Sequence, residues 1–396
     1  MKTAPAQSNK PVGTYVVLTV VLITFFDMFS QLPIISPHAS LLGAGVFMTG
    51  LTVAMYSLTN MVGNFFAGRV ISLTGKVNAI FGGMLVAGAA VSGYAMVNGP
   101  GEFLLLRAVH GLGTSVVVPA AYAYLGNLVS RDRRGKEMSK TGIAIGVAAL
   151  IGPAFGGIMK DRLGVDFVFW FVAASLAATA LLVRWILRDQ LDSTAAKEQA
   201  VPLKTLLNRR GLVTAYIAAF SLMFAKGTMA FSLPLYADSL GYSGGITGAL
   251  FSSFALAALL VFATPLNRVS DRVGRFGPLC TGLFLIGSSL ILLLLSGNLA
   301  YLLAVMFLYG IGFGFLFPTA TALVLDQTYP GERGTAFGLF YGVFSLGVVV
   351  GPVLSGFLAM WRVPSFLVGG SVALLGVFSL LLLKAGVPDP AALEEK

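Results

Sequence analysis

Residues 25–33 read Phe-Phe-Asp-Met-Phe-Ser-Gln-Leu-Pro, and Asp27 is the only charged residue between Thr14 and Pro37. An apolar run of this length is typical of a membrane-spanning helix. The run places the Asp27 carboxylate near mid-bilayer, where an ionised side chain costs roughly 2.5–3.5 kcal/mol on insertion scales. Asp27 is therefore a candidate functional residue, and it needs polar partners inside the protein.

The composition agrees with this interpretation. Of the 396 residues, 57% are hydrophobic and 11% are charged, whereas soluble proteins average about 45–50% and about 25%. These values predict an all-α polytopic membrane protein. With two His and one Cys, Cys280, we expect neither a disulfide framework nor a metal site. The net charge of +10 is typical of basic cytoplasmic loops, so we expect no nucleic-acid partner.

Twelve spans are expected, at about 14–37, 47–71, 77–97, 102–129, 138–159, 165–187, 211–237, 246–268, 276–296, 299–325, 334–360 and 363–384. An even number places both termini on one side of the membrane. Lys and Arg collect on that side, and the loops of the other side hold only Lys160, Arg162 and Arg362. The positive-inside rule then predicts a multi-pass protein of the cell (inner) membrane with both termini cytoplasmic.

The chain divides into two halves that repeat each other. Residues 188–210 are polar and predict a cytoplasmic linker between an N-terminal six-helix bundle, 1–187, and a C-terminal one, 211–396. Dipeptides recur at an offset of 199 residues: Arg69-Val70 and Arg268-Val269, Arg134-Gly135 and Arg333-Gly334, and Gly152-Pro153 and Gly351-Pro352. Parallel repeats in a twelve-span protein predict a transporter whose substrate site lies between the halves.

Two loops related by this offset carry the most specific motif. Residues 267–275 read Asn-Arg-Val-Ser-Asp-Arg-Val-Gly-Arg, and residues 68–76 read Gly-Arg-Val-Ile-Ser-Leu-Thr-Gly-Lys. Both resemble the loop signature G-x-x-x-D-R-x-G-R-R of the major facilitator superfamily, and the resemblance covers nearly the whole chain. It implies that family's fold, with twelve helices in two pseudo-symmetric six-helix bundles.

The same resemblance implies a cytoplasmic latch formed by Arg69, Gly75, Lys76, Asp271, Arg272, Gly274 and Arg275. The first loop departs from the pattern at Ser72 and Leu73, so we expect the second loop to carry more of that role. The other interpretation of both loops is a positively charged membrane anchor.

Span 4 contains Arg107-Ala-Val-His110-Gly-Leu-Gly, which resembles the family motif R-x-x-Q-G-x-G with His110 in place of Gln. The resemblance implies that Arg107 takes part in proton coupling. Helix rise places Arg107 and Asp27 at a similar depth, roughly 20 Å from the cytoplasmic edge. We therefore expect Asp27 to be the partner of Arg107 in proton coupling. The alternative is that Arg107 hydrogen-bonds to carbonyls and only holds helices together.

Span 5 contains Gly152-Pro153-Ala-Phe-Gly-Gly, and span 11 repeats Gly351-Pro352. These residues resemble the G-P-x-x-G-G motif of the family's proton-coupled drug and metabolite antiporters, which implies export. The other interpretation is close helix packing by small residues with no directional meaning.

Lys226 is the second charge near mid-membrane and holds the position equivalent to Asp27 in the repeat. It either binds an anionic substrate group, forms an ion pair between the halves, or packs against carbonyls. The residues expected to line the substrate cavity are Asp27, Gln31, Tyr56, Asn60, Asn64, Phe224, Lys226, Tyr236, Tyr309 and Phe313.

Together these features predict a secondary transporter that exports small organic molecules of the multidrug type in exchange for protons, by alternating access. The alternative is export of an anionic or zwitterionic metabolite, such as a metallophore or a lysolipid, through Lys226. The expected partners are substrate, protons and the bilayer, with no cofactor beyond the proton gradient, and the protein is expected to be a monomer. Residues 241–245 fit a hydrolase pattern, but they follow a membrane helix rather than a strand, so no enzyme is expected.

Overall fold

The computed structural model describes residues 10–128, 134–188, 203–329 and 331–383, and these residues form helices and connecting turns without a strand. The first half contains α1 (Lys10–Ser30), α2 (Ile35–Leu41), α3 (Val46–Thr74), α4 (Lys76–Tyr94), α5 (Pro100–Ser115), α6 (Val117–Leu128), α7 (Arg134–Leu163) and α8 (Val165–Ile186). The second half contains α9 (Leu203–Leu207), α10 (Arg210–Ser239), α11 (Gly244–Ala263), a 3₁₀ turn (Pro265–Arg268), α12 (Val269–Arg272), α13 (Phe276–Leu292), α14 (Leu299–Asp326), α15 (Arg333–Ala359) and α16 (Ser365–Leu383).

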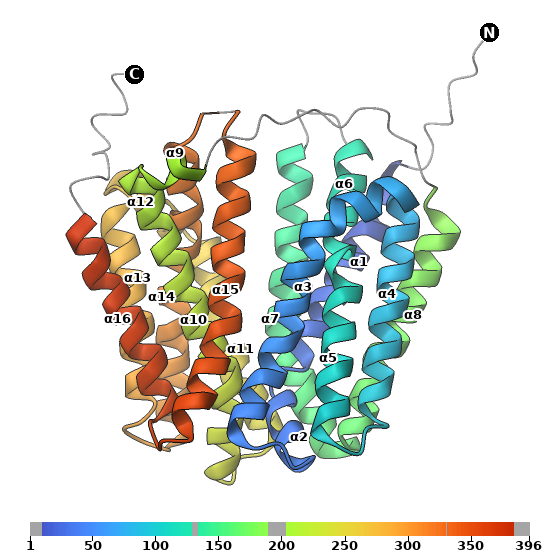
Figure 1. The fold of residues 1–396 in the computed structure, drawn as a ribbon, viewed down its shortest axis with the longest axis horizontal. Coiled ribbons are helices and arrows are strands. Elements are labelled where there is room, and N and C mark those ends of the chain that lie inside the picture. The colour runs from blue at the N-terminus through green and yellow to red at the C-terminus, as the bar shows by residue number, and fades with distance from the viewer. Residues whose placement is uncertain (1–9, 129–133, 189–202, 330, 384–396) are drawn as a thin grey trace.

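The prediction of twelve spans is confirmed. Eleven helices of the described chain are long and apolar enough to cross a membrane, with α5 and α6 counted as one crossing from Pro100 to Leu128. The twelfth is α13, a shorter apolar helix of 17 residues. Figure 1 shows α1 beginning and α16 ending at the same end of the molecule, here called the termini end, and α2 at the opposite, far end.

Two predicted span ends were wrong, and prolines explain both. The first span stops at Ser30 rather than Pro37, and a turn before α2 contains Pro33. The eighth span stops at Ala263 rather than residue 268, because Thr264 precedes a proline and adopts an extended conformation (φ −103°, ψ 167°). Proline lacks an N–H donor and disfavours helical geometry in the residue before it.

The apolar interior forms two separate hydrophobic cores, one in each half. The first contains only residues from Val16 to Leu187, and the second only residues from Leu206 to Leu380. Figure 1 shows the same division as two groups of helices. Most of the expected linker, residues 189–202, lies outside the described residues, and its last part forms the short helix α9.

The two halves meet along two seams, α7 with α11 and α3 with α15. In the first seam, the Asp161 carboxylate accepts hydrogen bonds from the backbone N–H groups of Gly244 (2.9 Å) and Gly245 (2.7 Å), at the start of α11. In the second seam, the rings of Phe47 and Phe357 meet edge to face at 6.3 Å. These contacts lie toward the far end, where α11 and α3 begin, so the halves are closed there (Figure 1).

Candidate functional site

Asp27 is fully buried near the end of α1 and is held by hydrogen bonds on both carboxylate oxygens. Oδ1 accepts from Gln31 Nε2 at 2.5 Å, one helical turn further on. Oδ2 lies 2.8 Å from His110 Nε2, which comes from α5. The other ring nitrogen of His110 lies 2.9 Å from the Tyr94 hydroxyl on α4. Three helices thus supply a buried Tyr94–His110–Asp27–Gln31 network.

Arg107 does not form the expected ion pair with Asp27. Its guanidinium donates to the carbonyls of Thr52 (3.3 Å) and Val53 (3.4 Å) and to Gln31 Oε1 (3.4 Å). The guanidinium also lies 5.0 Å from the centre of the Tyr56 ring. Arg107 therefore reaches Asp27 through Gln31 rather than directly, and its hydrogen bonds to carbonyls agree with the alternative interpretation.

His110 is a candidate site residue that the sequence motif contains but that was not predicted to belong to the site. It lies three positions after Arg107, so both project from one face of α5. It is fully buried and is the only residue that forms an ion-pair contact with Asp27 among the described residues. An imidazole changes charge near neutral pH, which the amide of Gln cannot do. The sequence feature that could have identified it is a titratable His at the position where the family motif has Gln.

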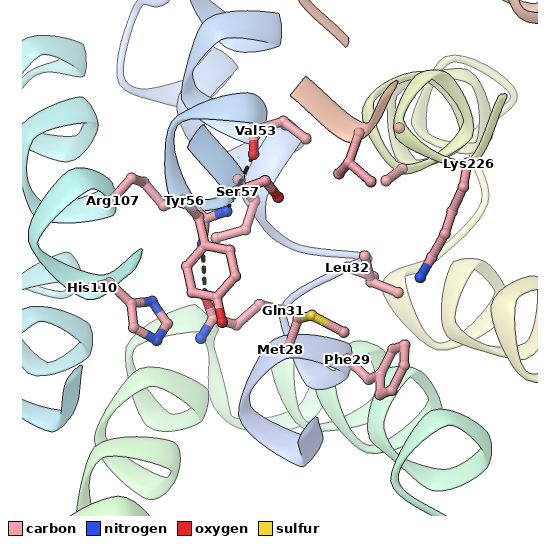
Figure 2. A pocket seen from close by; sticks show the side chains of 14 residues that line it. Met28, Phe29, Gln31, Leu32, Val53, Tyr56, Ser57, Arg107, His110 and Lys226 are labelled. Atoms are coloured by element: carbon pink, nitrogen blue, oxygen red, sulfur yellow. Dashed lines mark hydrogen bonds between the residues drawn. The ribbon is translucent and has the colours of Figure 1, made fainter. Parts of the chain in front are cut away.

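A cavity lies beside this network, between the halves, and is here called the inner cavity. It is lined by Met28, Phe29, Gln31, Leu32, Ile35, Val53, Tyr56, Ser57, Arg107, His110, Lys226, Gly227, Ala230 and Val348. Figure 2 shows Lys226 on one side of it and Arg107 and His110 on the other. Asp27 does not line the inner cavity, because Gln31 and His110 cover its carboxylate.

Lys226 carries the least satisfied charge in the inner cavity. Its Nζ lies 5.7 Å from the centre of the Phe29 ring, and it makes no hydrogen bond or ion pair with a described residue. The expectation that Lys226 shares a central cavity with the groups around Asp27 therefore agrees with this arrangement. A cation in this position can accept an anionic group.

A second, larger cavity, here called the vestibule, adjoins the inner cavity. Met28, Tyr56, Ser57 and Val348 line both. Asn60 and Asn64 also line the vestibule, and Asn64 donates to Asn60 Oδ1 at 2.8 Å. Its α15 residues, from Gly338 onward, belong to the part of α15 nearest the termini end. With the far end closed, the vestibule lies on the termini side of the network.

Besides Asp27, four residues expected to line the substrate cavity lie elsewhere. Phe224 is buried where α15 crosses α10, next to Gly347 and Gly351. Tyr309 is fully buried against Phe254. Tyr236 packs on the second core beside Phe366, and Phe313 stacks on Phe317. None of the four lines the inner cavity or the vestibule. Tyr309 belongs to the second core, Tyr236 and Phe313 pack against that core, and Phe224 is buried against α15.

The motif loops lie at the termini end, and each contains a glycine with positive φ, Gly75 (+88°) and Gly274 (+83°). Such values favour glycine, which has no Cβ. In the second loop, Arg275 pairs with Asp271 and also with Asp326 at 2.8 Å, and Asp326 ends α14. These pairs connect the loop to its own half. Arg69 and Arg272 are exposed, and the latch itself stays a prediction.

The glycine-proline motif of α7 lies where three helices come close. A Cβ on Gly156 would overlap the carbonyl oxygen of Ser30 on α1, and one on Gly157 would overlap that of Gly244 on α11. The Gly152 position likewise meets Phe29 at 2.9 Å. In the repeat, the Pro352 carbonyl fills the space that a Cβ on Gly50 of α3 would need, and Gly351 meets α10. The motif therefore packs helices both within each half and across the seams.

Comparison with known proteins decides the family. The model of the Major Facilitator Superfamily matches residues 17–262 and 215–396. The chain belongs to the major facilitator superfamily. It is thus a multi-pass membrane transport protein rather than an enzyme. In the hydrolase-like stretch, residues 241–245, the Ser243 side chain caps α11 by accepting a hydrogen bond from the backbone N–H of Ile246.

Relatives within the superfamily carry efflux names. The chain is 24% identical to Multidrug resistance protein 2 of Bacillus subtilis, over 96% of both chains. It is 26% identical to the multi-drug resistance efflux pump PmrA of Streptococcus pneumoniae, over 73% of this chain and 78% of that one. Among solved structures, peptide transporter POT in complex with sulfate superposes with a TM-score of 0.77 at 13% identity, covering 94% of each chain. A bacterial Spinster homologue gives 0.72 at 13%, covering 100% and 98%.

Proposed function

We propose that this superfamily member is a proton-coupled exporter of small organic molecules, with the Asp27–His110 pair as its proton site. The observation that carries the proposal is a buried acid–base pair whose imidazole lines the cavity between the halves. A proton added to this pair changes the charge of a water-poor site, where uncompensated charge is costly. Multidrug resistance and efflux names among the relatives support the export direction.

The cycle follows from where the charges lie. With the pair deprotonated and the vestibule open to the cytoplasm, substrate enters the inner cavity beside Arg107 and His110. Rocking of the two halves closes the termini end, opens the seams at the far end and releases substrate outside. A proton then binds the pair and weakens the hydrogen bond between Asp27 and Gln31. The protonated protein then returns to the conformation in which the vestibule is open to the cytoplasm. Protonation thus biases one of two conformations, as coupling requires.

A test uses purified protein in liposomes with an imposed pH gradient. Wild-type protein accumulates a cationic dye such as ethidium against its concentration gradient, whereas Asp27→Asn only lets the dye equilibrate. Asn keeps the size and one acceptor oxygen of Asp27 but cannot bind a proton at this position. An Asp27→Asn variant that still concentrates the dye as the wild type does refutes the proposed proton site.

A second candidate substrate class is favoured by Lys226. The inner cavity presents Lys226, Arg107 and His110, while the only nearby carboxylate is covered. Lys226 has no anionic partner among the described residues, and this favours an anionic or zwitterionic substrate. Lys226→Ala separates the two classes: it spares or improves export of cationic dyes, and it abolishes export if the substrate needs an anion-binding group. Lys226→Arg, which keeps the charge, is the control.

A further inference from the structure

A separate hollow lies at the termini end of the first half, where α4 begins and α8 ends. It is lined by Val77, Asn78, Arg184, Trp185, Leu187 and Arg188. None of these residues lines the inner cavity or the vestibule. The hollow therefore has no part in the transport site described above.

The two arginines of the hollow have no anionic partner in the described part of the chain. Arg184 and Arg188 are exposed, and neither guanidinium forms an ion pair or a hydrogen bond there. By contrast, Arg209 pairs with Glu332 at 2.6 Å and Arg275 with Asp326 at 2.8 Å, at the same end of the other half. The Arg188 carbonyl accepts a long hydrogen bond from the Tyr124 hydroxyl at 3.5 Å.

The side chains around the hollow indicate its depth in the membrane. Leu181 on α8 is 55% exposed and Trp185 is 88% exposed, so this face of the helix points away from the protein. Apolar exposed residues on a spanning helix face lipid tails, and Trp is enriched where tails meet headgroups. Arg184 and Arg188 flank Trp185 in sequence at the end of the span, and they therefore lie at headgroup level.

The chemistry of the hollow suits a phosphate group. Guanidinium groups bind phosphate oxygens in pairs with good geometry. The first turn of α4, which follows Gly75, adds the positive end of a helix dipole. The other half lacks this arrangement, because the 199-residue offset places Leu383 and Val387 at the positions of the two arginines.

We propose that this hollow binds the phosphate of an anionic phospholipid from the leaflet at the termini end, with Arg184 and Arg188 as the cationic ligands. Basic pockets between spanning helices are a known way for proteins to hold anionic headgroups. The acyl chains then lie along the exposed face of α8 that carries Leu181 and Trp185.

The first experiment measures lipid binding to the purified full-length chain by native mass spectrometry. Phosphatidylglycerol is titrated against phosphatidylcholine, and inorganic phosphate is added as a competitor. Arg184→Ala/Arg188→Ala is compared with Arg210→Ala/Arg333→Ala, which removes two exposed arginines at the same end of the other half. At about 1 kcal/mol per arginine and tenfold per 1.4 kcal/mol, the first double variant weakens phosphatidylglycerol binding about 30-fold. The control changes it less than about threefold.

Two results overturn the proposal. If the Arg184/Arg188 variant binds phosphatidylglycerol as tightly as the wild type does, the hollow is not the lipid site. If millimolar inorganic phosphate displaces the lipid completely, the hollow is a site for soluble anions.

A second measurement locates the lipid directly. Trp185 becomes the only tryptophan when Trp170 and Trp361 are replaced by Phe. Phosphatidylglycerol with brominated acyl chains then quenches Trp185 fluorescence more strongly than brominated phosphatidylcholine does at the same concentration. Equal quenching by both lipids contradicts selective binding beside α8.

Discussion

Replacement of His110 gives a quantitative test of the buried network. His110→Ala leaves Asp27 Oδ2 and the Tyr94 hydroxyl without their partners, which lie at 2.8 and 2.9 Å. A buried charge that loses its partner is destabilising by about 3–5 kcal/mol, and the lost hydrogen bond to Tyr94 adds about 1 kcal/mol. Asp27→Asn removes the charge itself and is expected to lower stability by only about 1–2 kcal/mol.

The double variant separates a direct pair from two independent effects. With Asn at position 27, loss of His110 no longer leaves a charge unpaired. The double variant is therefore expected to lose less stability than the sum of the two single losses, by about 2–3 kcal/mol. His110→Gln, which keeps an amide donor near Asp27, is expected to lower stability by about 1 kcal/mol.

The assay is thermal unfolding in detergent, followed with a thiol-reactive dye. Cys280 is the only cysteine in the chain and is partly buried in α13, so it reacts fully only when the second half unfolds. Because the cysteine lies outside the first half, unfolding is also followed by circular dichroism. If the effects of His110→Ala and Asp27→Asn add within about 0.5 kcal/mol, the two side chains do not interact and the reasoning is wrong.

Three further predictions concern the two ends of the molecule and the packing of α7. The hydrogen bond from Arg209 holds the pKa of Glu332 below its usual value of 4.5. The stabilisation that this pair contributes is therefore present above pH 4.5 and is lost as the pH falls through the lowered pKa. Melting temperatures of the wild type and Glu332→Gln should differ at about pH 7 and converge at low pH. Asp161→Asn weakens the two hydrogen bonds to the start of α11 and should raise the population open at the far end several-fold, seen as changed distances between spin labels across the seam, whereas unchanged distances exclude a closing role. Gly156→Ala forces α7 away from Ser30 and should lower stability by about 1–3 kcal/mol, and a melting temperature equal to that of the wild type contradicts the close packing.

The number and order of spans were predictable, because long apolar runs have few other structures available in a bilayer. The exact ends were less so: the predicted first span ran past Ser30 into a segment that contains Pro33, and the eighth ran past Ala263 into Pro265. The internal repeat was also recognisable in the sequence, and it pairs Lys226 with Asp27. In the structure, Lys226 lines the cavity beside the network that contains Asp27.

The partner of Asp27 was not predictable from depth alone. Arg107 and His110 lie on one face of α5. Which of them contacts Asp27 on α1 depends on the length and direction of the two side chains. The structure directs the long guanidinium to the carbonyls of α3 and leaves the imidazole for Asp27. The misplacement of Phe224 and Tyr309 has a related cause. Spans that are apolar on every side give no signal of which face meets the cavity.

The proposed proton site is tested most directly by counting the protons exchanged when substrate binds. A ligand is first identified by thermal stabilisation of the purified protein at two pH values, and its binding is then followed in weakly buffered detergent solution with a pH-sensitive dye. We expect about one proton exchanged per bound ligand in the wild type, and none in Asp27→Asn. A variant that still exchanges about one proton per ligand would place the proton site away from the Asp27–His110 pair.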